Sequence, residues 1–146
     1  MPVALDFDMA DKIKLRIVTP SRLMFDEEVD EVTASGELGE FGVLPNHISF
    51  LSTLVPGEMS FKQGANRRVM AVSGGYAEVL DNVMTVLATA AEFGAEIDSA
   101  RAQRAKERAE KQLADANREE KDFALAEVAL QRALVRLQVA SKEARR

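Results

Sequence analysis

The chain has 146 residues, of which 47% are hydrophobic, and it carries a formal net charge of −5. It contains no cysteine and a single histidine, which excludes disulfides, thiolate catalysis and metal sites built from cysteines or several histidines. No run of about eighteen apolar residues could cross a bilayer, and the first twelve positions do not resemble a targeting leader, so we expect a soluble, unprocessed chain.

The first two thirds of the sequence have the pattern of a β-protein. All eight glycines and all four prolines lie at or before Gly94, and short apolar or alternating runs recur between them. This pattern indicates an antiparallel β-sandwich of about eight to ten short strands. The expected strands cover residues 13–19, 29–34, 41–44, 50–54, 58–63, 67–73, 76–80 and 83–88.

Two of these strands carry further detail. Ile13, Leu15 and Ile17 alternate with basic residues, which is the pattern of a strand with one buried face. Asp81-Asn82 separates the last two expected strands and predicts a tight hairpin turn, although the glycine usual at its second position is absent.

The period of the sequence changes to that of helices after the last glycine. The predicted fold class is therefore α+β, with a β-sandwich over residues 1–94, including an extra N-terminal segment at 1–11, and a two-helix hairpin over 95–146. Asp98 is expected to cap the first helix through its side-chain oxygen. A polar stretch at 117–122 is expected to turn the chain into the second helix.

Each expected helix carries one apolar stripe at helical spacing. The first stripe is Ala102, Ala105, Ala109, Leu113 and Ala116, and the second is Phe123, Ala126, Leu130, Ala133, Leu134 and Leu137. An alanine-rich seam buries little area, so the hairpin gains only a few kcal/mol at about 25 cal/mol per Å². We therefore expect the hairpin to dock on the sandwich or on a partner, with a hinge at residues 94–97, as a conformational switch requires.

The charge is divided unevenly between the two parts. Residues 1–96 hold seven Lys or Arg against fifteen Asp or Glu, which gives −8, while residues 97–146 hold twelve against nine, which gives +3. This asymmetry suggests differently charged partners, although a merely solvated helical face remains an alternative.

The sequence offers little for catalysis. His47 is the sole histidine, and no nucleophile elbow, HExxH or phosphate-binding loop supports it. Ser73-Gly74-Gly75 precedes a strand and not a helix, so it indicates a turn and not a phosphate cradle. We predict a protein that is not an enzyme and has no metal site.

Four segments resemble a known family. They are GEFGVLPNH at 39–47, VSGGYAEV at 72–79, VMTVLA at 83–88 and IDSARA at 97–102. Together they are similar to the epsilon subunit of bacterial F-type ATP synthases, and the resemblance covers about residues 12–140, in both parts of the chain.

The resemblance implies a non-catalytic rotor subunit in the central stalk of a proton- or sodium-translocating ATP synthase. The sandwich would contact the gamma subunit and the c-ring and so couple ring rotation to ATP synthesis. Glu40 and His47 match the family positions that face those partners. The location implied is the cytoplasmic face of the bacterial inner membrane, peripheral and without membrane insertion.

The resemblance also implies that the hairpin inhibits ATP hydrolysis by extending along the stalk toward the alpha and beta subunits of the catalytic head. Arginines of both helices could pair with acidic loops of the beta subunits, in a salt-sensitive way. They are Arg101, Arg104, Arg108, Arg132 and Arg136.

The same arginine-bearing surface of the hairpin could instead bind a regulatory ATP. Some bacterial relatives bind ATP on the folded hairpin through an Ile-Asp-x-x-Arg-Ala motif and arginines of both helices. The matching residues here are Asp98, Arg101, Arg108, Arg132 and Arg136, with an inter-helix link one residue longer than in those relatives. The alternative function is a free-standing adaptor whose basic hairpin binds an acidic protein or nucleic acid; as a rotor subunit the chain would have no nucleic-acid partner.

Overall fold

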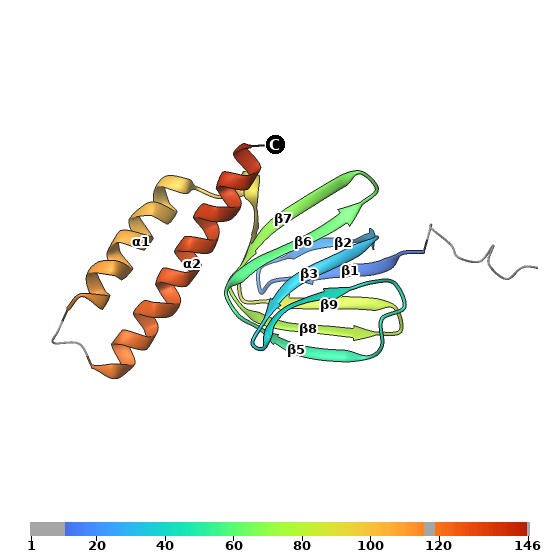
Figure 1. Ribbon diagram of the computed structural model, residues 1–146, viewed down its shortest axis with the longest axis horizontal. Coiled ribbons are helices and arrows are strands. Elements are labelled where there is room, and N and C mark those ends of the chain that lie inside the picture. The colour runs from blue at the N-terminus through green and yellow to red at the C-terminus, as the bar shows by residue number, and fades with distance from the viewer. Residues whose placement is uncertain (1–10, 116–118, 146) are drawn as a thin grey trace, which may run out of the picture.

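The computed structural model describes residues 11–115 and 119–145 (Figure 1). Ten strands come first in the chain, followed by a short 3-10 helix and two α-helices. The strands are β1 (Ile13–Val18), β2 (Leu23–Val29), β3 (Glu31–Gly36), β4 (Gly39–Val43), β5 (Phe50–Leu54), β6 (Gly57–Gln63), β7 (Asn66–Val72), β8 (Gly75–Leu80), β9 (Val83–Ala88) and β10 (Ala91–Phe93). The helices are η2 (Gly94–Glu96), α1 (Ser99–Leu113) and α2 (Glu120–Ala144). The predicted α+β class is confirmed.

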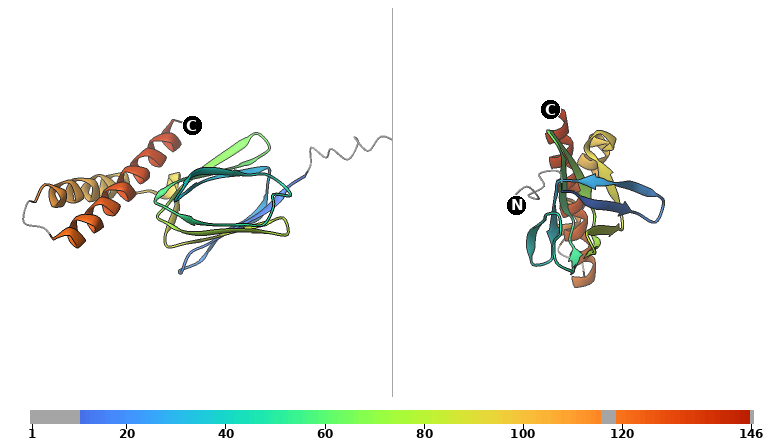
Figure 2. Two further views of the ribbon diagram at one scale, coloured as in Figure 1. Left: turned by 60° about the horizontal axis from the view of Figure 1, so that its bottom comes forward. Right: turned by 90° about the vertical axis from the view of Figure 1, so that its right-hand side faces the viewer.

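The strands form two layers around one core (Figure 2). Hydrogen bonds connect them in the order β10-β7-β6-β3-β5-β8-β9-β1-β2, with β4 paired to β3. The path passes from β3 to β5 through the single pair Gly36 and Leu54, so the sheet bends there into a sandwich. The β1–β9 pair is parallel, and the other strand pairs are antiparallel.

The core forms from the alternating faces of these strands. Ile13, Leu15 and Ile17 are all 0% exposed, while Arg16 lies on the outer face, as the alternation of this strand predicts. Each such side chain stabilises the fold by about 1.5–3 kcal/mol when it is fully buried. Phe25 and Phe61 add an aromatic contact across the core, with ring centroids 4.4 Å apart.

Strands β2 and β10 were missed by the sequence pattern. β2 contains Asp26-Glu27-Glu28, an acidic run that gives no clear apolar alternation. The outward Asp26 forms ion pairs across the strand pair with Lys14 at 3.3 Å and Arg16 at 3.5 Å. β10 has three residues and pairs with β7, which only the fold can reveal.

The predicted hairpin turn at Asp81-Asn82 is confirmed. It joins β8 to β9, and φ is +50° at Asp81 and +61° at Asn82, which are the left-handed values of a type I′ turn. Asparagine and aspartate tolerate this region better than other residues with a Cβ.

The two helices pack as an antiparallel hairpin, and α2 lies between α1 and the sandwich (Figure 1). Asp98 caps α1 as predicted, since its Oδ1 accepts the backbone N–H of Arg101 at 3.0 Å. The expected polar turn at 117–122 was placed too far along the chain, because α2 already begins at Glu120; residues 117 and 118 lie outside the described residues.

The helical stripes are partly confirmed. Ala102, Ala109, Ala126 and Ala133 are buried, so small side chains do form the seam. Phe123 and Leu134, however, are 42% and 44% exposed, because α2 turns its alanines toward α1 and leaves these larger side chains at the margin. Val139 is 0% exposed and was missed. Ala116 lies outside the described residues.

None of the helices in residues 11–115 and 119–145 combines the length and the apolar character needed to cross a bilayer. The division into domains at 1–94 and 95–146 stays a prediction. In the structure, α2 packs directly on β6 and β7.

Candidate functional site

The hairpin is fastened to the sandwich by polar contacts along α2. Arg136 forms a two-point ion pair with Glu92 of β10, at 2.8 Å from Nε and 3.1 Å from Nη2. Further along the helix, Lys142 donates to both carboxylate oxygens of Glu58 at 2.7 and 2.8 Å. Near the middle of the helix, the Gln131 side chain donates to the Pro56 carbonyl at 3.1 Å. These contacts define the docked pose of the hairpin.

Close packing supports the same pose near the end of α2. A Cβ atom added to Gly94 would lie 2.7 Å from Cβ of Glu143, closer than real Cβ contacts, so only glycine allows this approach. The buried Val139 lies one turn earlier on α2. Arg68 lies beside this region, with its guanidinium carbon 3.8 Å from the ring centroid of Phe93.

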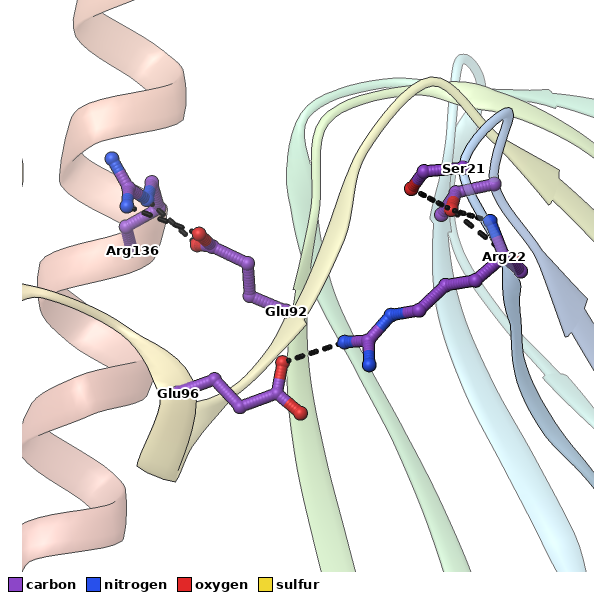
Figure 3. Close-up of polar contacts among 6 residues, drawn as sticks. Ser21, Arg22, Glu92, Glu96 and Arg136 are labelled. Carbon is purple, nitrogen blue, oxygen red and sulfur yellow. Dashed lines mark hydrogen bonds and ion pairs between the residues drawn. The ribbon is translucent and has the colours of Figure 1, made fainter.

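The segment before α1 is also held from its other side. Glu96 of η2 accepts a hydrogen bond from Arg22 of the β1–β2 connection at 3.1 Å, while Glu92 faces Arg136 (Figure 3). The linker between strands and helices is thus held both to α2 and to the β1–β2 connection.

A cavity of about 410 Å³ lies between the hairpin and the sandwich, which is a size typical of ligand sites. Three arginines contribute to its wall: Arg101 of α1 and Arg132 and Arg136 of α2. Small residues make most of the rest, which keeps the space open; they are Ala71, Ser73, Ala90, Ala91, Ala105, Ala129 and Ala133. Guanidinium groups are suited to phosphate and carboxylate oxygens. Glu92 also lines the cavity and pairs with Arg136, so Arg101 and Arg132 are the arginines of the wall that favour an anion.

The structure brings together only part of the predicted arginine set. Arg101, Arg132 and Arg136 share the cavity, whereas Arg108 is exposed and does not line it. Arg108 follows Arg101 by seven residues, so it lies about 10 Å further along α1. Asp98 is not in the wall either, and its carboxylate caps the helix that carries Arg101.

Three contributors were missed from the sequence. Glu92 and Ser73 line the cavity, and Glu58 holds Lys142. Ser73 precedes Gly74 and Gly75, whose φ values of +116° and +134° agree with the predicted turn. The one indication of these carboxylates in the sequence was the net negative charge of residues 1–96, beside the net positive charge of the hairpin.

The second predicted pair, Glu40 and His47, lies on separate segments. Glu40 is exposed within β4 and pairs in register with Ser35. His47 lies in the loop after β4, with Nδ1 2.8 Å from the Ile48 carbonyl oxygen and its ring centroid 5.6 Å from that of Phe50. No hydrogen bond or ion pair joins Glu40 to His47 within the described chain.

Acidic residues and the histidine do not gather into a metal site among residues 11–115 and 119–145, where no group of three or more His, Asp or Glu could hold an ion.

Comparisons with known proteins agree over most of the chain. A family model described as ATP synthase, Delta/Epsilon chain, beta-sandwich domain matches residues 12–94, and one described as the long alpha-helix domain of the same chain matches residues 95–141. The ATP synthase epsilon chain of Syntrophobacter fumaroxidans is 53% identical over 134 residues, which cover 92% of this chain and 99% of that one. The ATP synthase epsilon chain of Geobacter sulfurreducens is 48% identical over 138 residues, covering 94% and 100%.

Solved structures show the same fold. A chain of the Euglena gracilis mitochondrial ATP synthase, in a structure of OSCP, F1 and c-ring, matches with a TM-score of 0.76 and 24% identity, covering 97% of this chain and 86% of that one. A chain of the Tetrahymena thermophila mitochondrial ATP synthase central stalk and c-ring matches with a TM-score of 0.58 and 14% identity, covering 91% and 96%.

Proposed function

This chain belongs to the ATP synthase delta/epsilon family, and on that premise we propose that it couples c-ring rotation to ATP synthesis as a non-catalytic subunit of the central stalk and restrains ATP hydrolysis through its C-terminal hairpin. The family match covers both the sandwich and the helices. The comparisons give no support to the alternative of a free-standing adaptor.

The observation that carries the inhibitory role is the polar docking of α2. Arg136 and Lys142 hold acidic partners on the sandwich, through Glu92 and Glu58. Ion pairs at partly exposed positions are reversible, because each partner can regain water on separation. After release, the arginines could pair with acidic segments of the catalytic alpha and beta subunits, and the hairpin would inhibit ATP hydrolysis.

A regulatory ATP in the cavity would favour the docked pose. Arg101 and Arg132 come from different helices, while Ala71, Ser73, Ala90 and Ala91 of the wall come from the sandwich. A polyphosphate that bridges these elements would bind the docked form and not the extended one, and so shift the population by mass action.

The outer face of the sandwich offers a surface for the gamma subunit. Leu51, Tyr76, Leu80 and Leu87 are between 49% and 69% exposed and lie on the neighbouring strands β5, β8 and β9. Exposed apolar side chains grouped on one face are typical of a protein interface. Glu40 and His47 would add polar contacts with the stalk and the c-ring, at the cytoplasmic face of the membrane.

Deletion of residues 97–146 tests the inhibitory role. ATP synthase that is rebuilt with the truncated chain should hydrolyse ATP faster than the complex with the full chain, while assembly stays intact. Equal hydrolysis rates in the two complexes would contradict the proposed inhibitory role of the hairpin.

A further inference from the structure

The turn between β8 and β9 contains a side chain that reaches well beyond the turn itself. We propose that Asn82 is a positioning residue, which fixes the loop of residues 44–48 in the conformation that meets the rotor. This inference rests on the proposed function, which assigns that loop, through His47, to the interface with the stalk and the c-ring.

Asn82 joins three segments that are distant in the sequence. Its Oδ1 accepts the backbone N–H of Asn46 at 2.7 Å, and its Nδ2 donates to the Lys12 carbonyl at 2.9 Å. Its own carbonyl accepts the N–H of Lys14 at 3.2 Å. One residue therefore links the β8–β9 turn, the loop after β4 and the start of β1.

This link is the hydrogen bond that attaches the loop to the rest of the sandwich, beside the ring contact of His47 with Phe50. Residues 44–49 separate the end of β4 at Val43 from the start of β5 at Phe50, so no strand ladder holds them. The other hydrogen bonds of residues 44–48 in the described chain stay within the loop, from the His47 amide to Leu44 and between the His47 ring and Ile48. Asn46, where the bond to Asn82 ends, has a φ of +65°.

The identity of the residue at position 82 follows from this role. Glycine would suit the backbone better, since φ is +61° there. It would, however, remove the two side-chain hydrogen bonds and leave the Asn46 amide without its acceptor. Asparagine combines tolerance of the left-handed region with one donor and one acceptor.

A fixed loop favours association. Leu44 and Ile48 are 59% and 79% exposed on either side of His47, so the loop presents apolar side chains as well as the imidazole. If the loop is ordered before binding, less conformational entropy is lost on binding, and the affinity is higher for the same contacts.

Three variants of the full chain separate this role from a general effect on the turn. Asn82→Gly keeps the turn backbone and removes both side-chain bonds, and Asn82→Asp keeps the acceptor for Asn46. Asp81→Gly is the matched control, because Asp81 is in the same turn with φ +50° and its side chain has no partner in the described chain. The first readout is the exchange rate of the Asn46 amide by NMR, and the second is the affinity of the chain for ATP synthase depleted of this subunit.

We expect Asn82→Gly to speed exchange of the Asn46 amide and to weaken binding, each by about five- to tenfold, as the loss of one hydrogen bond allows. Asp81→Gly and Asn82→Asp should leave the Asn46 exchange rate within about twofold. Unchanged exchange in Asn82→Gly would overturn the proposal, and so would faster exchange with unaltered affinity.

The proposed contact of the loop is tested separately with His47→Ala. If this variant binds the depleted complex as tightly as the parent chain, the assignment of the loop to the interface fails. The exchange rate of Asn46 in Asn82→Gly still reports whether Asn82 orders the loop, so the two failures are distinguishable.

Discussion

Glu92 of β10 and Arg136 of α2 are 44 positions apart in the chain, and they meet in a two-point ion pair with distances of 2.8 and 3.1 Å (Figure 3). Their side chains are 33% and 20% exposed, so the pair is shielded from water on most sides. It gives the uneven charge of the sequence a structural meaning, because a partner of the basic hairpin is the acidic sandwich of the same chain.

Replacement of Glu92 by Gln should loosen the hairpin. A hydrogen bond to a charged group contributes about 1.5–3 kcal/mol, and solvent exposure reduces this to about 1–2 kcal/mol here. The undocked population should therefore rise by about five- to thirtyfold. Energy transfer between one dye on the sandwich and one on α1 measures it. Arg104→Ala is the control, since Arg104 is exposed and unpaired within the described chain.

A methyl group at position 94 should have a similar effect by a steric route. The added Cβ of Gly94→Ala would lie 2.7 Å from Cβ of Glu143, and overpacking of this kind costs about 1–3 kcal/mol. Gly42→Ala is a matched control, because its Cβ would meet only a carbonyl oxygen at 3.9 Å. Hydrogen exchange of the backbone amides of residues 135–144 measures this effect and should be faster in Gly94→Ala than in the parent chain. Equal or slower exchange would contradict the close contact.

The arginines of the cavity should differ from Arg108 in their effect on ATP. Arg132→Ala removes a guanidinium from the wall and should weaken ATP binding by about tenfold or more, whereas Arg108→Ala should change it by less than about threefold. Equilibrium dialysis of the full chain measures both. Equal losses in the two variants would mean that ATP does not occupy this cavity.

Asp30 should make the sandwich sensitive to acid. The hydrogen bond from Lys12 and that from the Gly64 amide lower the pKa of the Asp30 carboxyl below its usual range, against a smaller opposing effect of burial. Because the folded pKa is lowered, the stabilisation is present above about pH 4 and is lost as the pH falls through the folded value. The urea midpoint of Asp30→Asn should lie below that of the parent chain at pH 7, and the gap should close toward pH 2. A gap that is unchanged at low pH would contradict this assignment.

Some elements could be predicted because their determinants are neighbours in the sequence. The alternation from Ile13 to Ile17, the Asp81-Asn82 turn and the Asp98 cap each depend on residues within a few positions. Strand β2 could not be found in this way, because its acidic Asp26 is paired with Lys14 and Arg16 on another strand. The exposure of Phe123 and Leu134 was missed since helical spacing gives the face of a helix but not which part of that face a partner covers.

The sequence by itself determined that a glycine-rich β-sandwich precedes a hairpin without glycine, that the two carry opposite charge, and which arginines were candidates for a polyanion. Only the tertiary structure decided that Arg101, Arg132 and Arg136 share one cavity, that Arg108 does not, and that Glu92 and Glu58 are the docking partners. The reason is physical: periodicity and turn chemistry are local properties, whereas a contact between residues 44 or 84 positions apart depends on how α2 rotates and settles on the sandwich.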